Sequence, residues 1–403
     1  MPKKYLTLLA AALVAGAAFA QSGPTIYGVA DLSLDSVSAT GSTAGAAGND
    51  IPSHTRLNAN SSLFGVKGKL DVGSGNAVIY LFETYVDLGN SQYASANVNS
   101  VASNGTTVTG TTGSLTSVFG ARRDTFVGMT GDWGTLKAGY LTSGFRGATA
   151  KVDLAPGATG VTAAYEVFGS GGAGKNWFQR YPSVMYTTPD FSGFSAALNY
   201  IPNTQKAVEP GTVDPGGWDV LARYENKLFN VTYVHTDLKD LMFGGFASEK
   251  NKSDGLFAGI TFPTGTTVSA MYNVSKATLL PTGIGATSFE VKQNSFYIGV
   301  KQTVDKHEFM INYQSAPKHT ASNLPTTGPL AVTYAEADSG ARSIAFRYAY
   351  NFFKSAQVYA QYAAITNEAA TAINFNIGTI GGVGQLKAGA DPKAFGVGLR
   401  FAF

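Results

Sequence analysis

The sequence predicts an all-β fold: a transmembrane antiparallel β-barrel of about 16 strands. Three observations predict this class. The chain ends in a strand with one large apolar face, many other segments alternate in the same way, and the connections between them are short and long in turn.

The last ten residues, 394–403, show the clearest alternation. Large apolar side chains occupy one face, and small residues with Arg400 occupy the other. Such a strand fits between lipid and a lumen, since its small-residue face is a poor choice for a soluble surface. An edge strand in lipid must pair, and the first predicted strand, residues 25–38, is the simplest partner.

Period-two alternation recurs along the chain. Each such segment has one uncharged, lipid-compatible face, and its charges gather on the other face. The clearest examples are residues 220–225, 230–235, 295–301, 308–314 and 344–352. A soluble β-sandwich is the alternative, but its outer face would have to meet water, and alanine and glycine are poorly suited to that.

The connections predict how the strands are joined. Short turns lie near residues 73–76, 131–134, 190–193, 225–228, 263–265, 305–307 and 353–355. Long loops lie near residues 39–55, 90–116, 145–179, 203–216, 240–252, 279–291, 319–340 and 368–391. Seven turns and eight loops join sixteen strands. An even strand number with short turns at one end is the layout of bacterial outer-membrane barrels.

The N-terminus predicts export. Lys3 and Lys4 precede an apolar run at residues 6–19, which ends at a small-residue cleavage site before Gln21. This pattern is a signal peptide, residues 1–20, because the run is too short for a membrane-spanning helix. Residues 21–403 then form a single barrel domain, and we expect it in the cell outer membrane.

Composition argues against several functions. Only 14% of residues are charged, against about a quarter in typical soluble domains. Removing the signal takes two lysines from 29 basic residues and nothing from 26 acidic ones, so the mature chain is nearly neutral and does not suggest nucleic acid as a partner.

No catalytic centre is evident in the sequence. Cysteine is absent, and the four histidines, 54, 235, 307 and 319, have no metal-ligand spacing on one element. We therefore expect no catalytic residues, no metal, no cofactor and no enzyme activity.

Several motifs carry a family resemblance along the mature chain. They are SLFGVKG at 62–68 with DVG at 71–73, RDTFVGM at 123–129 with GDWGTL at 131–136, SVMY at 183–186 with PDFSGF at 189–194, residues 350–359, and GLR at 398–400 before the terminal phenylalanine. In this order and spacing the chain resembles the general porins of Gram-negative bacteria, particularly the β-proteobacterial type.

The resemblance implies a homotrimer of barrels that passes ions and small hydrophilic solutes by passive diffusion through the outer-membrane lipid. It implies that loop three, about residues 145–179, folds into the barrel and narrows it. It also implies that the C-terminal strand, with Phe401 and Phe403, is the assembly signal. Loop two would latch onto a neighbouring subunit, and the first and last strands would form the subunit wall.

Charge at a narrow point sets which ions pass a pore. Arg123 shares a face with Thr125 and Val127, and this face is interpreted as the lumen. Arg180 is the second basic candidate, although alternation would turn it outward unless a bulge lies near Pro182. Glu83, on the face of Ile79 and Leu81, resembles the luminal glutamate of the family.

Loop three and a departure from the family pattern complete the predicted constriction. The loop contributes Arg146, Lys151, Asp153 and Glu166. Family members often carry arginine where this chain has Leu63 and Tyr140. Their absence predicts weak anion preference or near non-selectivity.

Two other functions remain open from the sequence. A substrate-specific channel for aromatic acids or sugars would be favoured if Tyr140, Tyr165, Phe168 and Trp177 lined the lumen. A surface adhesin or receptor barrel is supported only by the long Ser/Thr-rich loop at residues 90–117.

Overall fold

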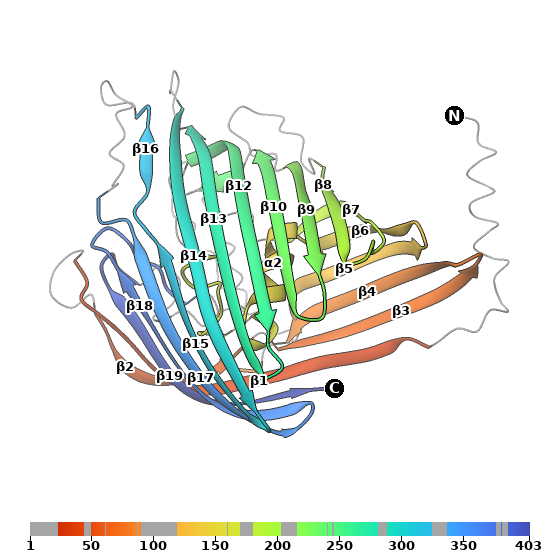
Figure 1. Cartoon of the computed structure of the whole chain (residues 1–403). Helices are drawn as coiled ribbons and strands as arrows, with labels where there is room; N and C mark the ends of the chain where they lie inside the picture. The colour runs from red at the N-terminus through yellow and green to blue at the C-terminus, as the bar shows by residue number, and fades with distance from the viewer. Residues whose placement is uncertain are drawn as a thin grey trace.

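The structure, a computed structural model, is one continuous sheet rolled into a barrel (Figure 1). It describes residues 23–43, 50–60, 62–86, 88–89, 119–158, 160–169, 180–202, 216–239, 241–243, 246–280, 288–324, 337–375, 380 and 386–403. The predicted signal peptide and Trp177 lie outside these ranges.

Nineteen strand segments make up the described sheet. They are β1 (Thr25–Thr40), β2 (Ile51–Ala59), β3 (Leu63–Gly73), β4 (Asn76–Val86), β5 (Phe119–Gly131), β6 (Gly134–Thr142), β7 (Arg180–Thr187), β8 (Phe194–Ile201), β9 (Gly216–Glu225), β10 (Phe229–Lys239), β11 (Leu241–Phe243), β12 (Phe246–Thr261), β13 (Thr266–Leu280), β14 (Phe289–Val304), β15 (His307–Ala316), β16 (Thr320–Ser322), β17 (Ala341–Phe353), β18 (Ala356–Asn367) and β19 (Asp391–Ala402).

Three of the spanning strands are interrupted. β2 and β3 both pair with β1, β10 and β11 both pair with β12, and β15 and β16 both pair with β14. Counting each of these pairs as one span gives the sixteen antiparallel spans that the sequence predicts.

The first and last strands close the ring. β1 pairs with β19 from Val29/Ala402 to Thr40/Asp391 without a register shift. Beyond the ladder, the backbone N–H of Gly28 donates to the carbonyl of Phe403 at 3.0 Å, and the N–H of Phe403 donates to the carbonyl of Gly28 at 3.1 Å. The predicted barrel closure is confirmed, and it leaves no open sheet edge for lipid to face.

The short turns also lie where the sequence predicts them. Between β3 and β4, Ser74 and Gly75 both have positive φ, 52° and 72°. Positive φ at both central residues is the geometry whose twist matches a two-residue hairpin. All seven predicted turns join consecutive strands at one end of the barrel. The loops predicted at 240–252 and 279–291 are shorter than expected, because β12 begins at Phe246 and β14 at Phe289.

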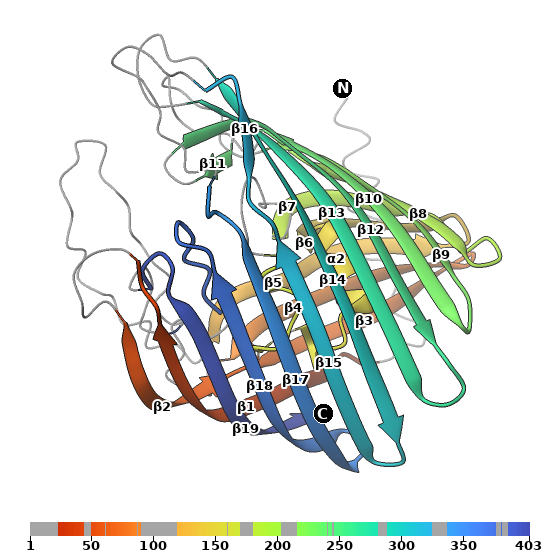
Figure 2. The ribbon, with the colours of Figure 1, turned by 60° about the vertical axis from the view of Figure 1, so that its left-hand side comes forward.

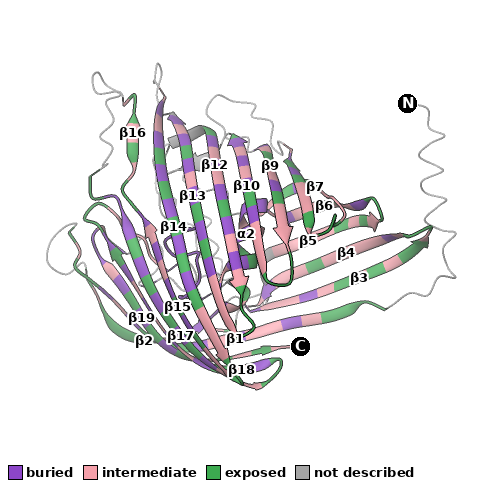
Figure 3. Cartoon of the chain, in the orientation of Figure 1, coloured by how far each residue is buried: buried purple, intermediate pink, exposed green. Residues whose placement is uncertain are grey.

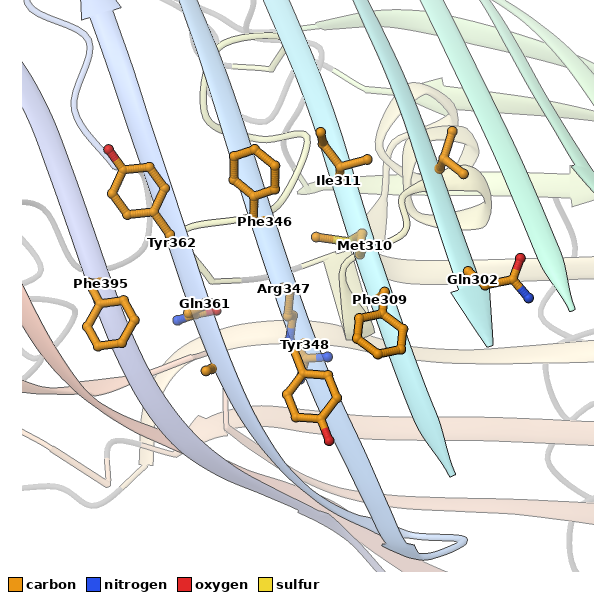
Figure 4. Close-up of a pocket in the computed structure, with 12 residues that line it drawn as sticks. Gln302, Phe309, Met310, Ile311, Phe346, Arg347, Tyr348, Gln361, Tyr362 and Phe395 are labelled. Carbon is orange, nitrogen blue, oxygen red and sulfur yellow. The ribbon is translucent and has the colours of Figure 1, made fainter. Parts of the chain in front are cut away.

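The two faces of the sheet differ as the alternation predicts. On β17, the side chains of Phe346 and Tyr348 are 43% and 38% exposed on the outer face, whereas Arg347 between them is only 7% exposed on the luminal face. Figure 4 shows these side chains projecting from opposite faces. The same banding of buried and exposed residues runs along β12, β13 and β14 in Figure 3. The outer face is therefore the lipid face.

Part of the long connection between β6 and β7 lies inside the barrel. It contains helix α2 (Gly144–Val152) and a short 3₁₀ turn, η2 (Pro156–Ala158). Figures 1 and 2 show α2 enclosed by the strands, and it contacts β9, β10, β12 and β13. In the described part of the chain, no helix combines the length and apolar character needed to span a membrane.

Closure can be tested at Leu34, which pairs with Val397 on β19 and Leu57 on β2. Leu34→Pro should prevent closure, since proline removes a ladder donor within a strand paired on both sides and costs about 3 kcal/mol or more. The fast-migrating folded band on unheated SDS gels should be lost. Leu34→Ala should keep that band, and a folded Leu34→Pro protein would contradict the closure described here.

Candidate functional site

Loop three is anchored first through helix α2. Ser143 caps the helix, and its hydroxyl accepts from the N–H of Arg146 at 3.2 Å. The N–H of Gly144 donates to the Asp219 carboxylate on β9 at 3.0 Å. One face of the helix carries the buried residues Phe145, Ala148, Thr149 and Val152, at the spacing of successive helical turns.

An aromatic cluster fixes that helix face to the inner wall. The rings of Phe145 and Phe257 meet edge to face with centroids 4.9 Å apart, and Phe168 from the far side of the loop meets Phe257 at 6.3 Å. All three side chains are fully buried. Pairs of this geometry add about 0.5–1.5 kcal/mol beyond their area burial, so the cluster ties the two halves of the loop together.

Gln314 on β15 holds the second half of the loop. Its side-chain oxygen accepts from the N–H groups of Val167 and Phe168 at 3.1 and 3.0 Å, and its side-chain nitrogen donates to the carbonyl of Ala163 at 2.8 Å. Asn312 adds a donor to the carbonyl of Thr162 at 2.8 Å. These bonds satisfy loop backbone groups that would otherwise be buried without partners.

The two predicted loop-three acids lie within the packed loop. Asp153 ends α2, and its carboxylate accepts from the N–H groups of Ala155 and Ala164 at 3.0 and 2.8 Å. Burial raises the pKa of Asp153 to about 7 in spite of these donors. Glu166 is 1% exposed and lies close enough to Arg56 for electrostatic interaction.

The two predicted loop-three bases are on the less buried face of α2. The guanidinium of Arg146 stacks on the ring of Tyr165, 4.5 Å from its centroid. The Lys151 ammonium pairs with the Glu225 carboxylate on β9 at 2.6 Å, and both side chains are more than one-third exposed. Arg146 and Lys151 thus have partners within the barrel.

A charged cluster occupies the wall formed by β1 and β4 to β7. Glu83 accepts from the hydroxyl of Tyr27 at 2.7 Å and from the guanidinium of Arg123. We call this network, with the neighbouring ion pair between Arg180 and Asp124, the wall cluster. The Asp124 carboxylate also accepts from the hydroxyl of Thr142 at 2.6 Å.

Arg123 reaches Glu83 because of a β-bulge that strict side-chain alternation does not predict. Thr125 pairs with Phe82 and Val127 with Tyr80, on the outer face, and Val127 is 57% exposed. The interpretation of the face shared with Thr125 and Val127 as luminal was therefore wrong. The β4–β5 register shifts between Phe82 and Thr84, and this bulge brings Arg123 beside Glu83.

Arg180 also departs from the expected geometry. The β6–β7 ladder runs to Thr142/Arg180 without a shift, so the bulge considered near Pro182 is absent. Arg180 nevertheless reaches Asp124. Tyr140 pairs with Thr125 and Pro182 and lies on β6 between the exposed Ala138 and Thr142, whose hydroxyl reaches Asp124 in the wall cluster.

Two lysines near the wall cluster lie over aromatic rings, and neither forms an ion pair among the described residues. The Lys67 ammonium lies 4.9 Å from the Tyr27 ring centroid, and the Lys137 ammonium lies 4.9 Å from that of Phe126. The sequence analysis did not select either lysine for the constriction. Lys137 could have been found, because it alternates with the apolar Leu136 and Ala138 directly after a recognisable turn.

The remaining predicted residues are placed as follows. Tyr165 and Phe168 are buried within loop three rather than lining an open track, and Trp177 is outside the described ranges. Phe401 and Phe403 stack at 6.0 Å on the exposed outer face beside the closure. Among the described residues, no cluster of three or more histidines and acids could hold a metal ion.

The sequence matches the family described as Gram-negative porin over residues 6–370, which is most of the chain. The chain belongs to the Gram-negative porin family. It is therefore a channel protein of the outer membrane.

Individual relatives agree with this assignment. The chain is 24% identical over 425 residues to outer membrane porin protein 32 of Delftia acidovorans, and the alignment covers all of both chains. It is 29% identical over 158 residues to the major outer membrane protein P.IA of Neisseria meningitidis serogroup C, covering 39% of this porin and 33% of that protein.

Solved porin structures share the fold. An anion-selective porin from Comamonas acidovorans superposes with a TM-score of 0.68 at 20% identity, covering 94% of this chain and 99% of that one. OmpT of Vibrio cholerae, described in a trimer form, gives 0.62 at 13% identity, with 94% and 99% covered.

Loop docking can be tested through Gln314. Gln314→Leu replaces the amide with an apolar side chain of similar size. It leaves the backbone N–H groups of Val167 and Phe168 and the carbonyl of Ala163 unpaired, at about 1–3 kcal/mol each. Single-channel recordings should show noisier current, while the barrel melting temperature changes little. Gln361→Leu, at a buried luminal glutamine on β18, is the matched control; equal noise in both variants would contradict a specific role for Gln314.

The raised pKa of Asp153 predicts that the docking of loop three depends on pH. Its pKa rises from 3.8 to about 7 in the docked loop, so the docked state holds a proton that a solvated loop releases. Docking should lose stability as pH rises through this window. Current noise should increase from pH 5 to pH 8, and Asp153→Asn should remove the dependence. An unchanged slope in Asp153→Asn would assign the effect to another group.

Proposed function

We propose that this porin is a general diffusion channel for ions and small hydrophilic solutes, near non-selective with a weak anion preference. The observation that carries the proposal is the pairing of the wall cluster: each arginine there has a carboxylate beside it. Loop three, packed on the opposite side of the barrel, would narrow the lumen against this wall.

The pairing decides the predicted selectivity. Glu83 and Arg123 lie side by side instead of facing each other across the lumen, so together they contribute little net charge to a passing ion. Arg180 with Asp124 and Lys151 with Glu225 behave likewise. Lys67 and Lys137 then supply the positive excess, and a small excess in a focused field favours anions weakly. The anion-selective porin of Comamonas acidovorans supports this direction.

The constriction residues are part of the same proposal. We assign the wall side to Glu83, Arg123, Asp124 and Arg180, and the loop side to Arg146 and Lys151. Asp153 and Glu166 act indirectly by shaping the loop, and Tyr140, two residues before Thr142 on β6, stands at the edge of the wall cluster.

Assembly and processing follow the resemblance. We propose that residues 1–20 are removed, that residues 21–403 form the mature barrel, and that three barrels associate through a wall that includes β1 and β19. The trimer form of the similar Vibrio cholerae protein supports this arrangement. We also propose that the barrel has no catalytic activity, because the charged groups of the wall cluster are engaged with one another.

The selectivity is tested by reversal potential in a KCl gradient. The double variant Lys67→Gln/Lys137→Gln should lose the anion preference, and its reversal potential should move to zero or to the cation side. The control is Glu83→Gln/Arg123→Gln, which removes one charge of each sign and should leave the reversal potential nearly unchanged. A larger shift in the control than in the lysine variant would contradict the proposal, and strong cation selectivity of the unaltered porin would overturn it.

A further inference from the structure

Three lysines occupy neighbouring positions on the outer face of the barrel. Lys252 on β12 pairs directly with Lys276 on β13, and Lys276 pairs directly with Lys292 on β14. These strands lie side by side in Figure 1, with β16 at their long-loop end. We call Lys252, Lys276 and Lys292 the lysine row.

The lysine row faces outward. Asn251 and Ser275, which precede Lys252 and Lys276 in sequence, are buried on the luminal side, while the side chains of Lys252 and Lys276 are 43% and 48% exposed. Like charges directly opposite each other destabilise a sheet, and charge is costly on the lipid face of a barrel near the bilayer centre. Three lysines here therefore require compensation.

The depth of the row explains how charge is tolerated there. Tyr233, Leu256, Tyr272 and Phe296 form an outward row of directly paired residues, of the kind found at a membrane interface. The lysine row lies four residues further toward the long-loop end, about 13 Å along the strands. That level is above the hydrocarbon core, among lipid headgroups.

Carboxylates of the chain itself neutralise only part of the positive charge of the lysine row. Lys252 pairs with Asp237 at 3.0 Å, and Lys276 pairs with Glu290 at 2.6 Å. No carboxylate of the described residues lies within ion-pair distance of Lys292.

A hollow with a mixed polar and apolar lining lies over the row. It has a volume of about 410 Å³ and is lined by the three lysines, Asp254, Glu290 and the β16 residues Thr320 and Ser322. Ammonium groups are donors to phosphate oxygens, and three lysines stand against two carboxylates in the lining. Three other hollows on the described outer wall, over β8–β10, over β14–β19 and over β1, β2 and β17–β19, have largely apolar linings.

We propose that the lysine row is a binding site for the phosphate-bearing headgroup of an outer-leaflet lipid. The lipid phosphate compensates the adjacent positive charges, and the acyl chains of the lipid lie along the apolar outer face below the row of Tyr233, Leu256, Tyr272 and Phe296. A second copy of this chain is a poorer occupant, because β12–β14 lie on the side of the ring away from β1 and β19, the proposed subunit wall.

The test uses the full mature chain, refolded in detergent, with diphosphorylated lipid A as the probe and native mass spectrometry as the readout. Lys252→Gln/Lys276→Gln/Lys292→Gln should lower lipid A affinity by roughly tenfold or more, as expected for three surface lysines near anionic lipid. The matched control, Lys227→Gln/Lys306→Gln/Lys354→Gln, removes three lysines from turns at the opposite end and should bind lipid A unchanged.

A single substitution tests the site even if the triple variant misfolds. Lys292→Gln leaves both ion pairs of the row intact, so it should fold normally and still bind lipid A more weakly. Inorganic phosphate at matched concentration should not displace the lipid, whereas monophosphorylated lipid A should bind with intermediate affinity.

Three results would overturn the proposal. Equal lipid A binding by the triple variant and the unaltered chain would show that the row is not the site. Displacement by inorganic phosphate alone would indicate a soluble-anion site. Loss of oligomers without loss of lipid binding in the triple variant would indicate a subunit interface.

Discussion

Pairing of the first and last strands is the constraint on which the rest of the molecule depends. Lipid offers no partners to backbone groups, so a spanning sheet must close, and β1 with β19 supplies that closure through an unshifted ladder that continues to Gly28 and Phe403. Once the ring is closed, the side-chain alternation has fixed consequences. One face meets lipid, and the other encloses a lumen in which polar and charged groups can be placed.

The lumen is shaped by polar contacts that a soluble core would avoid. Gln314, Asn312 and Asp219 are buried wall residues whose side chains satisfy the backbone of loop three. The loop in turn covers much of one wall, and the charged groups of the opposite wall pair among themselves. Structure and electrostatics therefore lead to the same account: a narrowed passage with a small net charge.

The sequence predicted the barrel better than the site. Strand number, turn positions and closure follow from period-two patterns and turn chemistry, which are local. Arg123 shows the limit, because a bulge opposite Glu83 shifts its direction and no local pattern marks that bulge. Tyr165 and Phe168 show another limit, since whether a loop aromatic is buried depends on contacts with Phe257, which is distant in the sequence. The partners Glu83 and Asp124 likewise become evident only when strands are placed side by side.

The central claim is that an open lumen, narrowed by the docked loop three, crosses this barrel. Single-channel conductance of the refolded protein in concentrated KCl, with polyethylene glycols of graded size, tests it most directly. The account predicts discrete open steps that small polymers reduce and larger polymers leave unchanged, with a cut-off smaller than an unobstructed sixteen-stranded barrel would give. Absence of steps from a correctly folded barrel, or the cut-off of an unobstructed barrel, would contradict it.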